Sequence, residues 1–172
     1  DIRIKLHVED VYYSVRSSTE RKRVMQQVKV NEDVLIMFSG SGVYCMVIGK
    51  NSKAKKIVGV EINQIANKFD LENIKLNKLE NVKLHKGDVR LVAPKLGKFD
   101  RIAMPLPRSA EFFLDVALKS IKKNGIIHFY DIEREGEEGL GKAKVKKACS
   151  IAKKKCRILK VVKTGQVGPR EN

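Results

Sequence analysis

The chain has 172 residues, 42% of them hydrophobic, which predicts one domain of ordinary size with a core of its own. No apolar run approaches the roughly 20 residues that span a bilayer, and the first residues do not form a signal peptide, so we expect a cytoplasmic protein. Its 36 Lys and Arg residues exceed its 20 Asp and Glu residues, which makes the net charge +16.

This basic excess favours a polyanionic partner, most often a nucleic acid, over a lysine-rich surface that is merely solvated. The three cysteines, Cys45, Cys149 and Cys156, lack the spacing of metal ligands and are expected to be reduced thiols. We therefore expect no metal site, and we expect the chain to be a monomer.

The predicted elements begin with residues 2–12, which alternate at first between apolar and polar side chains and so indicate a strand. Candidate N-caps at 17–19 precede a basic helix over 21–28. We assign residues 1–30 to this N-terminal extension and residues 31–172 to the main domain.

Beyond residue 31, short apolar strands and longer helices alternate with short connections. Strands are predicted over 34–38, 57–61, 82–86, 100–104, 126–130 and 158–163, and helices over 43–50, 64–77, 109–122 and 142–155. This rhythm predicts an α/β fold, a doubly wound, Rossmann-like domain with a mostly parallel sheet.

A glycine turn follows the strand over 34–38 at once and opens the next helix. Gly40 and Gly42 bring backbone N–H groups to a helix N-terminus without side chains in the way, which suits a nucleotide-like ligand. Glu61 ends the next strand nineteen residues after Gly42, where its carboxylate can accept hydrogen bonds from ribose hydroxyls.

Two cofactor classes use such an opening. A nicotinamide site needs a third glycine three residues after the second, and this chain has Cys45 there, which disfavours a dehydrogenase. An S-adenosylmethionine (AdoMet) site needs the two glycines, an acid after the second strand and a polar residue after the third, and Glu61 and Asp88 fill the last two positions. The alternative is a Rossmann-like domain whose acids only cap helices.

Several motifs together carry a resemblance to one family. They are Val11–Arg16 with Thr19–Arg21, Met37–Gly42, Glu61–Asn63, Glu72–Lys78, Gly87–Arg90, Met104–Pro107, Gly125–Tyr130 and Gly168–Glu171. With them the chain resembles the catalytic domain of the archaeal and eukaryotic tRNA guanine-37 N1-methyltransferases, a family that includes related enzymes of the wybutosine pathway. The resemblance implies the class I AdoMet methyltransferase fold, AdoMet as cofactor and tRNA as partner.

The resemblance also implies roles for individual residues. Glu20 would be the general base that takes the N1 proton of guanine, because neutral guanine carries a proton there and is a poor nucleophile. Arg16 would stabilise charge on guanine O6 or hold a phosphate, and Pro107 would stiffen the loop that presents the base. The expected cofactor-binding residues are Phe38, Gly40, Gly42, Glu61, Ile62, Asp88, Val89 and Met104, and the expected substrate-binding residues are Tyr12, Arg21, Arg23 and Leu106. The alternative for Glu20 is a first-turn helix carboxylate favoured by the helix dipole.

The chain also departs from the family pattern. Ile36 replaces an acid that would hold the AdoMet amino group, and Pro105 replaces an asparagine that would hydrogen-bond the target base. N-terminal tRNA-gripping domains and a final strand after Pro169 and Arg170 are expected of the family and are not found in the 172 residues. Three hypotheses follow: methyl transfer to guanine N1, transfer of the 3-amino-3-carboxypropyl group of AdoMet, and a non-catalytic RNA-binding relative.

Overall fold

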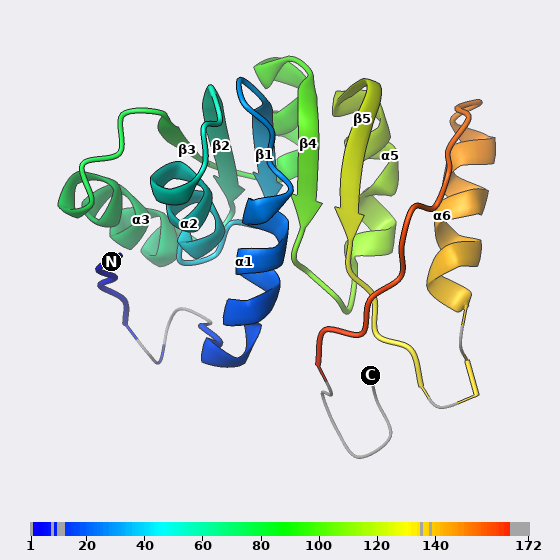
Figure 1. Ribbon diagram of the computed structural model, residues 1–172, viewed down its shortest axis with the longest axis horizontal. Helices are drawn as coiled ribbons and strands as arrows, with labels where there is room; N and C mark the ends of the chain where they lie inside the picture. Colours follow the sequence, from blue (N-terminus) through cyan, green and yellow to red (C-terminus); the bar gives the residue numbers. More distant parts are fainter. Residues whose placement is uncertain (1, 8, 10–12, 135, 138, 166–172) are drawn as a thin grey trace.

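A computed structural model describes residues 2–7, 9, 13–134, 136–137 and 139–165 of the chain. In this part, five parallel strands form one sheet in the order β3-β2-β1-β4-β5 (Figure 1). The order runs outward from β1 in both directions, so that β1 pairs with β2 on one side and with β4 on the other. This confirms the doubly wound α/β class, and the strands are all parallel rather than mostly so.

The first half of the sheet contains three strands and the helices between them. Its elements are β1 (Asp33–Met37), α2 (Val43–Asn51), β2 (Lys56–Glu61), α3 (Gln64–Leu76) and β3 (Val82–Lys86). The second half follows the same alternation. Its elements are α4 (Val89–Val92), η2 (Ala93–Leu96), β4 (Phe99–Met104), η3 (Ala110–Phe113), α5 (Leu114–Ser120), β5 (Ile121–Phe129) and α6 (Leu140–Ile151).

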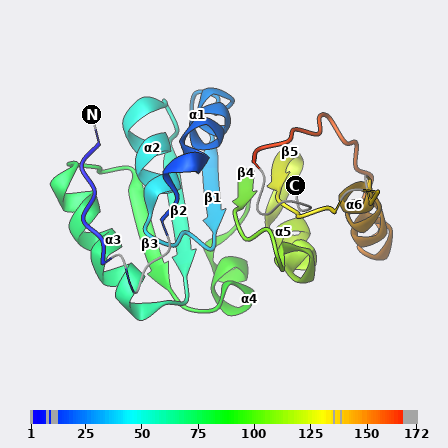
Figure 2. The same ribbon diagram turned by 90° about the horizontal axis from the view of Figure 1, so that it is seen from below.

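Helices cover both faces of the sheet. Seen from below, α1 (Ser18–Gln26) and α2 lie on one face and α4 and α5 on the other, while α6 stands beyond β5 (Figure 2). Along β1, alternate side chains enter two different cores: Val34 and Ile36 pack towards α2, and Leu35 and Met37 pack towards α5. Strands buried on both faces are continuous apolar runs, which explains why the sequence of β1 shows no polar alternation.

The N-terminal extension differs from the prediction. The described residues among 2–12 form no strand; instead, the backbone at Arg3 and Lys5 hydrogen-bonds the side-chain amides of Asn77 and Asn73 on α3, at distances of 2.7–2.9 Å. Ile2 and Ile4 are partly buried and pack against the core cluster on this helix side of the sheet rather than forming a strand. An alternating pattern reports one buried face, and a helix can supply the surface that covers it.

A short 3₁₀ turn, η1 (Val15–Ser17), then leads into α1 (Ser18–Gln26), which begins three residues earlier than predicted. α1 lies at the edge of the sheet where the strands of Figure 1 end. Val24 on α1 is fully buried, as its spacing in the sequence indicates.

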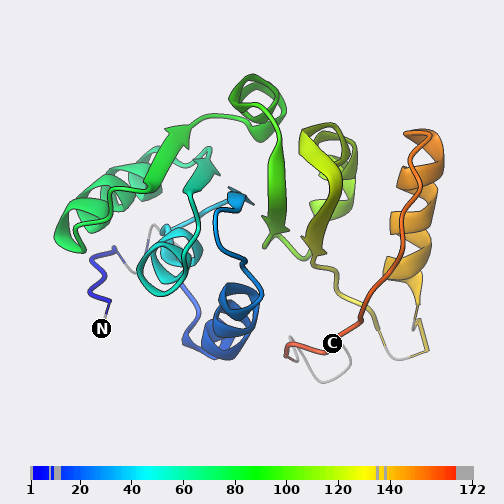
Figure 3. The ribbon, with the colours of Figure 1, turned by 45° about the horizontal axis from the view of Figure 1, so that its top comes forward.

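The C-terminal half contains two further corrections. The predicted helix over 109–122 is a 3₁₀ turn followed by the shorter α5, because the chain already enters β5 at Ile121. Phe99 pairs with Ile121 and Arg101 pairs with Ile126, so a register shift accommodates the extra residues of β5 between these two pairs. The predicted strand over 158–163 has no regular structure, and Leu159 and Val161 are each 62% exposed. Figure 3 shows this segment leaving the end of α6 and heading towards the side of the sheet where β5 ends. Strand-forming residues need a hydrogen-bonding neighbour, which none of the described residues supplies here.

Candidate active site at the carboxyl edge of the sheet

The glycine turn joins β1 to α2 at the point where the strand order reverses, which is where open α/β sheets bind ligands. Phe38, Gly40 and Gly42 all have positive φ angles, of 60°, 56° and 68°, and Gly42 is the N-cap of α2. A Cβ atom on Gly40 would meet no atom within 4 Å, so the space in front of the turn is open. The structure thus contains the side-chain-free cradle that the sequence predicts.

Glu61 lies opposite this turn at the end of β2. One carboxylate oxygen accepts the Gly40 N–H at 2.7 Å, and the other accepts the Asn63 N–H at 2.8 Å. Each carboxylate oxygen has two lone-pair sites, so Glu61 retains capacity for two hydroxyl donors. Ile62 follows with 67% of its surface exposed and offers an apolar contact beside the carboxylate.

The ends of β3 and β4 complete this edge. Asp88 caps α4 by accepting the Arg90 N–H at 2.8 Å, and it forms an ion pair with the Arg90 guanidinium at 2.6 Å. The hydrogen bonds from Arg90 hold the pKa of Asp88 below its ordinary value. Val89 and Met104 are 3% and 0% exposed, so their side chains support the site from the core.

An aromatic pair covers the far side of the edge. Phe38 meets the ring of Phe113 edge-on, with centroids 4.8 Å apart, and the Arg90 guanidinium lies 5.4 Å from the Phe113 centroid. Backbone N–H groups, a carboxylate suited to diols and apolar side chains are together the chemistry of a nucleoside site. The residues present therefore fit AdoMet, with Glu61 as the candidate for its ribose hydroxyls and the Gly40–Gly42 turn as the close backbone contact.

Glu20 is 6% exposed on α1 and holds three charge-assisted hydrogen bonds. Arg23 donates to both of its oxygens at 2.6 and 2.7 Å, and the Tyr130 hydroxyl donates at 2.6 Å. Burial alone would raise the pKa of this carboxyl, but the hydrogen bonds from Arg23 and Tyr130 outweigh it and the pKa lies below its ordinary value. Glu20 is therefore an anion at neutral pH.

Tyrosine hydroxyls connect Glu20 to the cradle. The Tyr130 hydroxyl, at the end of β5, lies 3.1 Å from the Tyr44 hydroxyl, and Tyr44 is in the first turn of α2, two residues after Gly42. Burial raises the pKa of both phenols, so each hydroxyl keeps its proton and can donate. The structure thus brings the predicted base and the predicted cofactor turn to one edge of the sheet.

A buried cation supports this arrangement from below. Arg101 on β4 is 1% exposed and donates to Glu32 at 2.8 and 3.1 Å, to the Gln27 carbonyl at 2.6 Å, and lies 2.9 Å from His128 Nε2. Burial, with Arg101 beside it, lowers the pKa of His128 to about 4, so the imidazole is neutral and accepts from the guanidinium. This network ties the end of α1 to β4 and β5.

The structure places the predicted substrate-binding residues in different surroundings. Arg21 is 6% exposed: its guanidinium donates to the Ser14 carbonyl at 3.0 Å and lies over the Tyr13 ring. Arg23 is the partner of Glu20. Neither arginine is a free basic side chain on the surface, because each carries an internal hydrogen bond.

The other predicted residues lie on two loops. Leu106 is half-buried in the turn after β4, where its N–H donates to the Met104 carbonyl at 2.7 Å, and Pro107 beside it is exposed. Arg16 is within η1, and Tyr12 lies outside the described residues.

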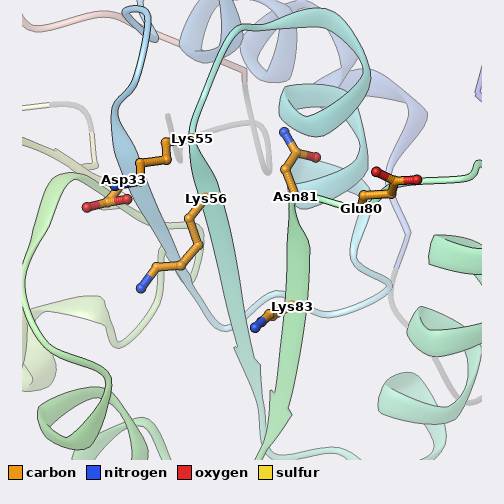
Figure 4. A pocket seen from close by; sticks show the side chains of 6 residues that line it. All are labelled: Asp33, Lys55, Lys56, Glu80, Asn81 and Lys83. Carbon is orange, nitrogen blue, oxygen red and sulfur yellow. The ribbon is translucent and has the colours of Figure 1, made fainter.

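One surface hollow lies elsewhere. It measures about 360 Å³ and is at the amino ends of β1, β2 and β3 (Figure 4), lined by Asp33, Lys55, Lys56, Glu80, Asn81 and Lys83. Its lining lacks a glycine turn or a helix N-terminus, and it faces away from the strand ends where Glu20 and Glu61 lie. We therefore place the site at the carboxyl edge.

Within the described residues, no group of three His, Cys, Asp or Glu side chains is placed to hold a metal ion. No helix in the described part of the chain is long and apolar enough to cross a membrane.

Sequence reasoning missed four side chains that the structure places at or below this edge: Tyr44, Asp70, Arg101 and Tyr130. Each is in a helix or strand, or directly after one, whose periodicity accounts for it as an ordinary packed residue. Their partners are 27 to 110 residues away in the chain, and no local pattern reports such contacts.

Comparison with known proteins identifies relatives of this chain. The chain is 42% identical over 136 residues to the tRNA (guanine(37)-N(1))-methyltransferase Trm5b of Pyrococcus abyssi, covering 79% of this chain and 40% of that protein. It is 36% identical over 131 residues to the tRNA(Phe) (4-demethylwyosine(37)-C(7)) aminocarboxypropyltransferase of Methanocaldococcus jannaschii, covering 76% and 52%. The chain thus spans about half the length of these curated relatives.

Solved structures match the whole domain. The crystal structure of M. jannaschii TYW2 in complex with AdoMet superimposes with a TM-score of 0.89 at 31% identity, covering 98% of this chain and 77% of that one. The complex of aTrm5 and tRNALeu matches with a TM-score of 0.82 at 35% identity, covering 99% and 47%. The sequence model of the TRM5/TYW2 methyltransferase domain matches residues 1–162, and the chain therefore belongs to this family of Rossmann-like class I methyltransferases.

Proposed function

We propose that the chain is the catalytic domain of an AdoMet-dependent tRNA methyltransferase that methylates N1 of guanine at position 37. The observation that carries this proposal is the anionic, buried Glu20, which two tyrosine hydroxyls connect to the helix that opens from the glycine turn. A proton acceptor and a nucleotide cradle at one edge are what N1 methylation requires, because N1 must lose its proton to become a nucleophile.

The cradle residues hold the cofactor, which supplies a methyl group on a positively charged sulfur. Glu61 accepts from its ribose hydroxyls, and Ile62 packs against its apolar part. The open space before Gly40 lets the backbone approach closely. Holding the methyl donor and the base in one orientation replaces an unfavourable bimolecular encounter.

Glu20 accepts the N1 proton of guanine. A low pKa makes it a weak base in water, but it keeps the carboxylate ionised and ready in a buried setting. Both oxygens are engaged by Arg23 and Tyr130, so Glu20 exchanges one of these donors for the N1–H group when the base enters. Arg16 stabilises the negative charge that develops on O6, and the turn at Leu106 and Pro107 positions the ring.

Two findings support tRNA as the partner. The chain has a net charge of +16, and polyanions bind such surfaces by releasing counterions. The related aTrm5 was solved in complex with tRNALeu. Because the chain spans about half of its relatives' length, the recognition of a particular tRNA stays part of this proposal.

A label-transfer experiment tests the proposed reaction. The protein is incubated with transcript tRNA and with AdoMet that carries a label either on its methyl group or on its carboxyl group. We expect only the methyl label to enter the RNA, as 1-methylguanosine at position 37, and a guanine-37→adenine transcript to stay unlabelled. Incorporation of the carboxyl label instead would identify aminocarboxypropyl transfer.

Aminocarboxypropyl transfer is the second candidate, favoured by the 36% identity to the M. jannaschii enzyme of that activity. The two reactions break different bonds at the same sulfur, so a small change in the orientation of the cofactor separates them.

A non-catalytic RNA-binding domain is the third candidate. It is supported by Ile36, fully buried in β1, and by Pro105 in the loop after β4, at the two positions where the family pattern has polar side chains. Absence of calorimetric binding at millimolar AdoMet would favour it.

Glu20→Gln is expected to lower the methylation rate at least about 100-fold, the usual range for a lost general base, while AdoMet affinity stays unchanged. The glutamine keeps the size of the side chain and can still accept from Tyr130, so the fold is retained. Single-turnover rates and calorimetric affinities measure the two effects. Glu72→Gln, on the exposed face of α3, is the matched control. A normal rate in Glu20→Gln would remove Glu20 from the role of base.

A further inference from the structure

One buried acid near the site has no role in the reaction described so far. Asp70 is on α3, is 0% exposed, and neither of its carboxylate oxygens has a hydrogen-bond partner. Leaving a carboxyl group buried without a donor costs stability, and an apolar side chain of similar size would fill the same position at no such cost. A residue of this kind calls for a functional reason.

Asp70 lies directly behind the glycine turn. A Cβ atom built on Gly42 would come within 2.6 Å of Asp70 Oδ1 and 3.0 Å of its Cγ, so the carboxyl touches the backbone at the start of α2. The titratable groups that face it from neighbouring elements are Glu61 on β2 and Cys45 on α2. Burial, with Glu61 beside it, raises the pKa of Asp70 to about 8. The carboxyl is therefore protonated and neutral when the site holds no cation.

The other acids of the edge are already engaged. Glu61 accepts two backbone N–H groups, and Asp88 is paired with Arg90. β1 contributes no acid after Asp33, because Val34–Met37 are all apolar. Among these carboxyl groups, Asp70 is the one whose two oxygens both lack a hydrogen-bond partner in the described part of the chain.

We propose that Asp70 is the counter-charge of the cofactor site: it holds a proton while the site is free and releases it to solvent when a cationic cofactor binds at the glycine turn. The inference rests on the proposed function, since AdoMet carries both a sulfonium and an ammonium group. Asp70 is a positioning residue under this proposal, because it acts through the turn and from within the core. It would couple cofactor affinity to pH.

Calorimetry of AdoMet binding in buffers of different protonation enthalpy tests the proposal, with the wild-type chain and Asp70→Asn compared. We expect the wild type to release close to one proton more per bound AdoMet at pH 7 than the variant does. Its affinity should rise by up to about tenfold per pH unit between pH 6 and 8, as proton linkage requires. Asp70→Asn removes the protein's contribution to the proton release and leaves the contribution of the cofactor's own ammonium group.

Other ligands and variants identify the source of the effect. Adenosine, which is neutral, should bind both proteins without proton release. S-adenosylhomocysteine keeps the ammonium and lacks the sulfonium, so it shows which of these two cationic groups causes the release. Cys45→Ser alters the other titratable group on α2, and His7→Gln alters one in the N-terminal segment that lies along α3. Both variants should still release the proton when AdoMet binds. Equal proton counts in wild type and Asp70→Asn would overturn this inference alone. Binding of neither adenosine nor AdoMet would overturn the proposed function and the inference with it.

A second measurement keeps the inference testable without any ligand. The pKa of Asp70 is raised above its unfolded value of 3.8, so the protonated form stabilises the fold at low pH and this contribution is lost as pH rises through about 8. The midpoint temperature of thermal unfolding should therefore fall further between pH 6 and 8.5 for the wild type than for Asp70→Asn. Parallel curves for the two proteins would contradict the protonated state on which the inference depends.

Discussion

Gly42→Ala is expected to weaken AdoMet binding by at least about tenfold and to destabilise the fold at the same time. The φ angle of 68° at this position costs a side-chain-bearing residue about 1–2 kcal/mol. The new Cβ would also lie 2.6 Å from Asp70 Oδ1, far closer than real Cβ atoms approach. Because Asp70 is fully buried, it cannot turn away into solvent, and either the glycine turn or α3 must move. Such overpacking costs a further 1–3 kcal/mol or so.

Calorimetric titration and urea unfolding measure the two effects of Gly42→Ala, and two other variants separate their causes. Gly40→Ala has a similar φ of 56° and meets nothing within 4 Å, so it should lose less stability but place its methyl group in the open space before the turn. The double variant Gly42→Ala with Asp70→Ala removes the clash and should regain stability, a coupling that a double-mutant cycle measures. Equal stability of Gly42→Ala and Gly40→Ala would show that the contact with Asp70 is unimportant.

Arg101→Met is expected to destabilise the fold by about 3–5 kcal/mol, a large part of the stability of a single domain. Methionine fills much of the volume but removes every donor, which leaves the Glu32 carboxylate and the Gln27 carbonyl without a partner in a half-buried region. Breaking one side of such a network costs more than removing both, because the remaining charge keeps its desolvation penalty.

Urea unfolding measures the loss in Arg101→Met, and the chain offers a matched control. Arg90 is also paired with an acid, but its side chain is 63% exposed and solvent screens the pair, so Arg90→Met should change the stability little. Combining Arg101→Met with Glu32→Gln removes the unpaired charge and should recover part of the loss. If Arg101→Met were as stable as Arg90→Met, the network would not support the α1 edge of the site.

The strands and the cofactor turn of this chain are readable from local sequence. β1 is a run of buried residues, Gly40 and Gly42 have the positive φ angles that glycine tolerates, and Glu61 ends the next strand at the predicted position. Two elements were predicted and are not found: a strand within 2–12 and a strand over 158–163. Both would need a neighbouring strand. Their side-chain patterns report burial or strand propensity, but a strand exists only where a second strand accepts its hydrogen bonds.

The sequence by itself therefore determined the doubly wound fold, the glycine turn and the position of Glu61, because these follow from periodicity, backbone freedom and residue chemistry along a few adjacent positions. The role expected of Glu20 came from the family resemblance. Only the tertiary structure decided which groups hold Glu20 as an anion, that Arg101 bonds His128 inside the fold, and that Asp70 is buried behind Gly42 without a donor. Charge state and hydrogen bonding in a low-dielectric interior are set by partners from distant parts of the chain, and packing alone brings those partners together.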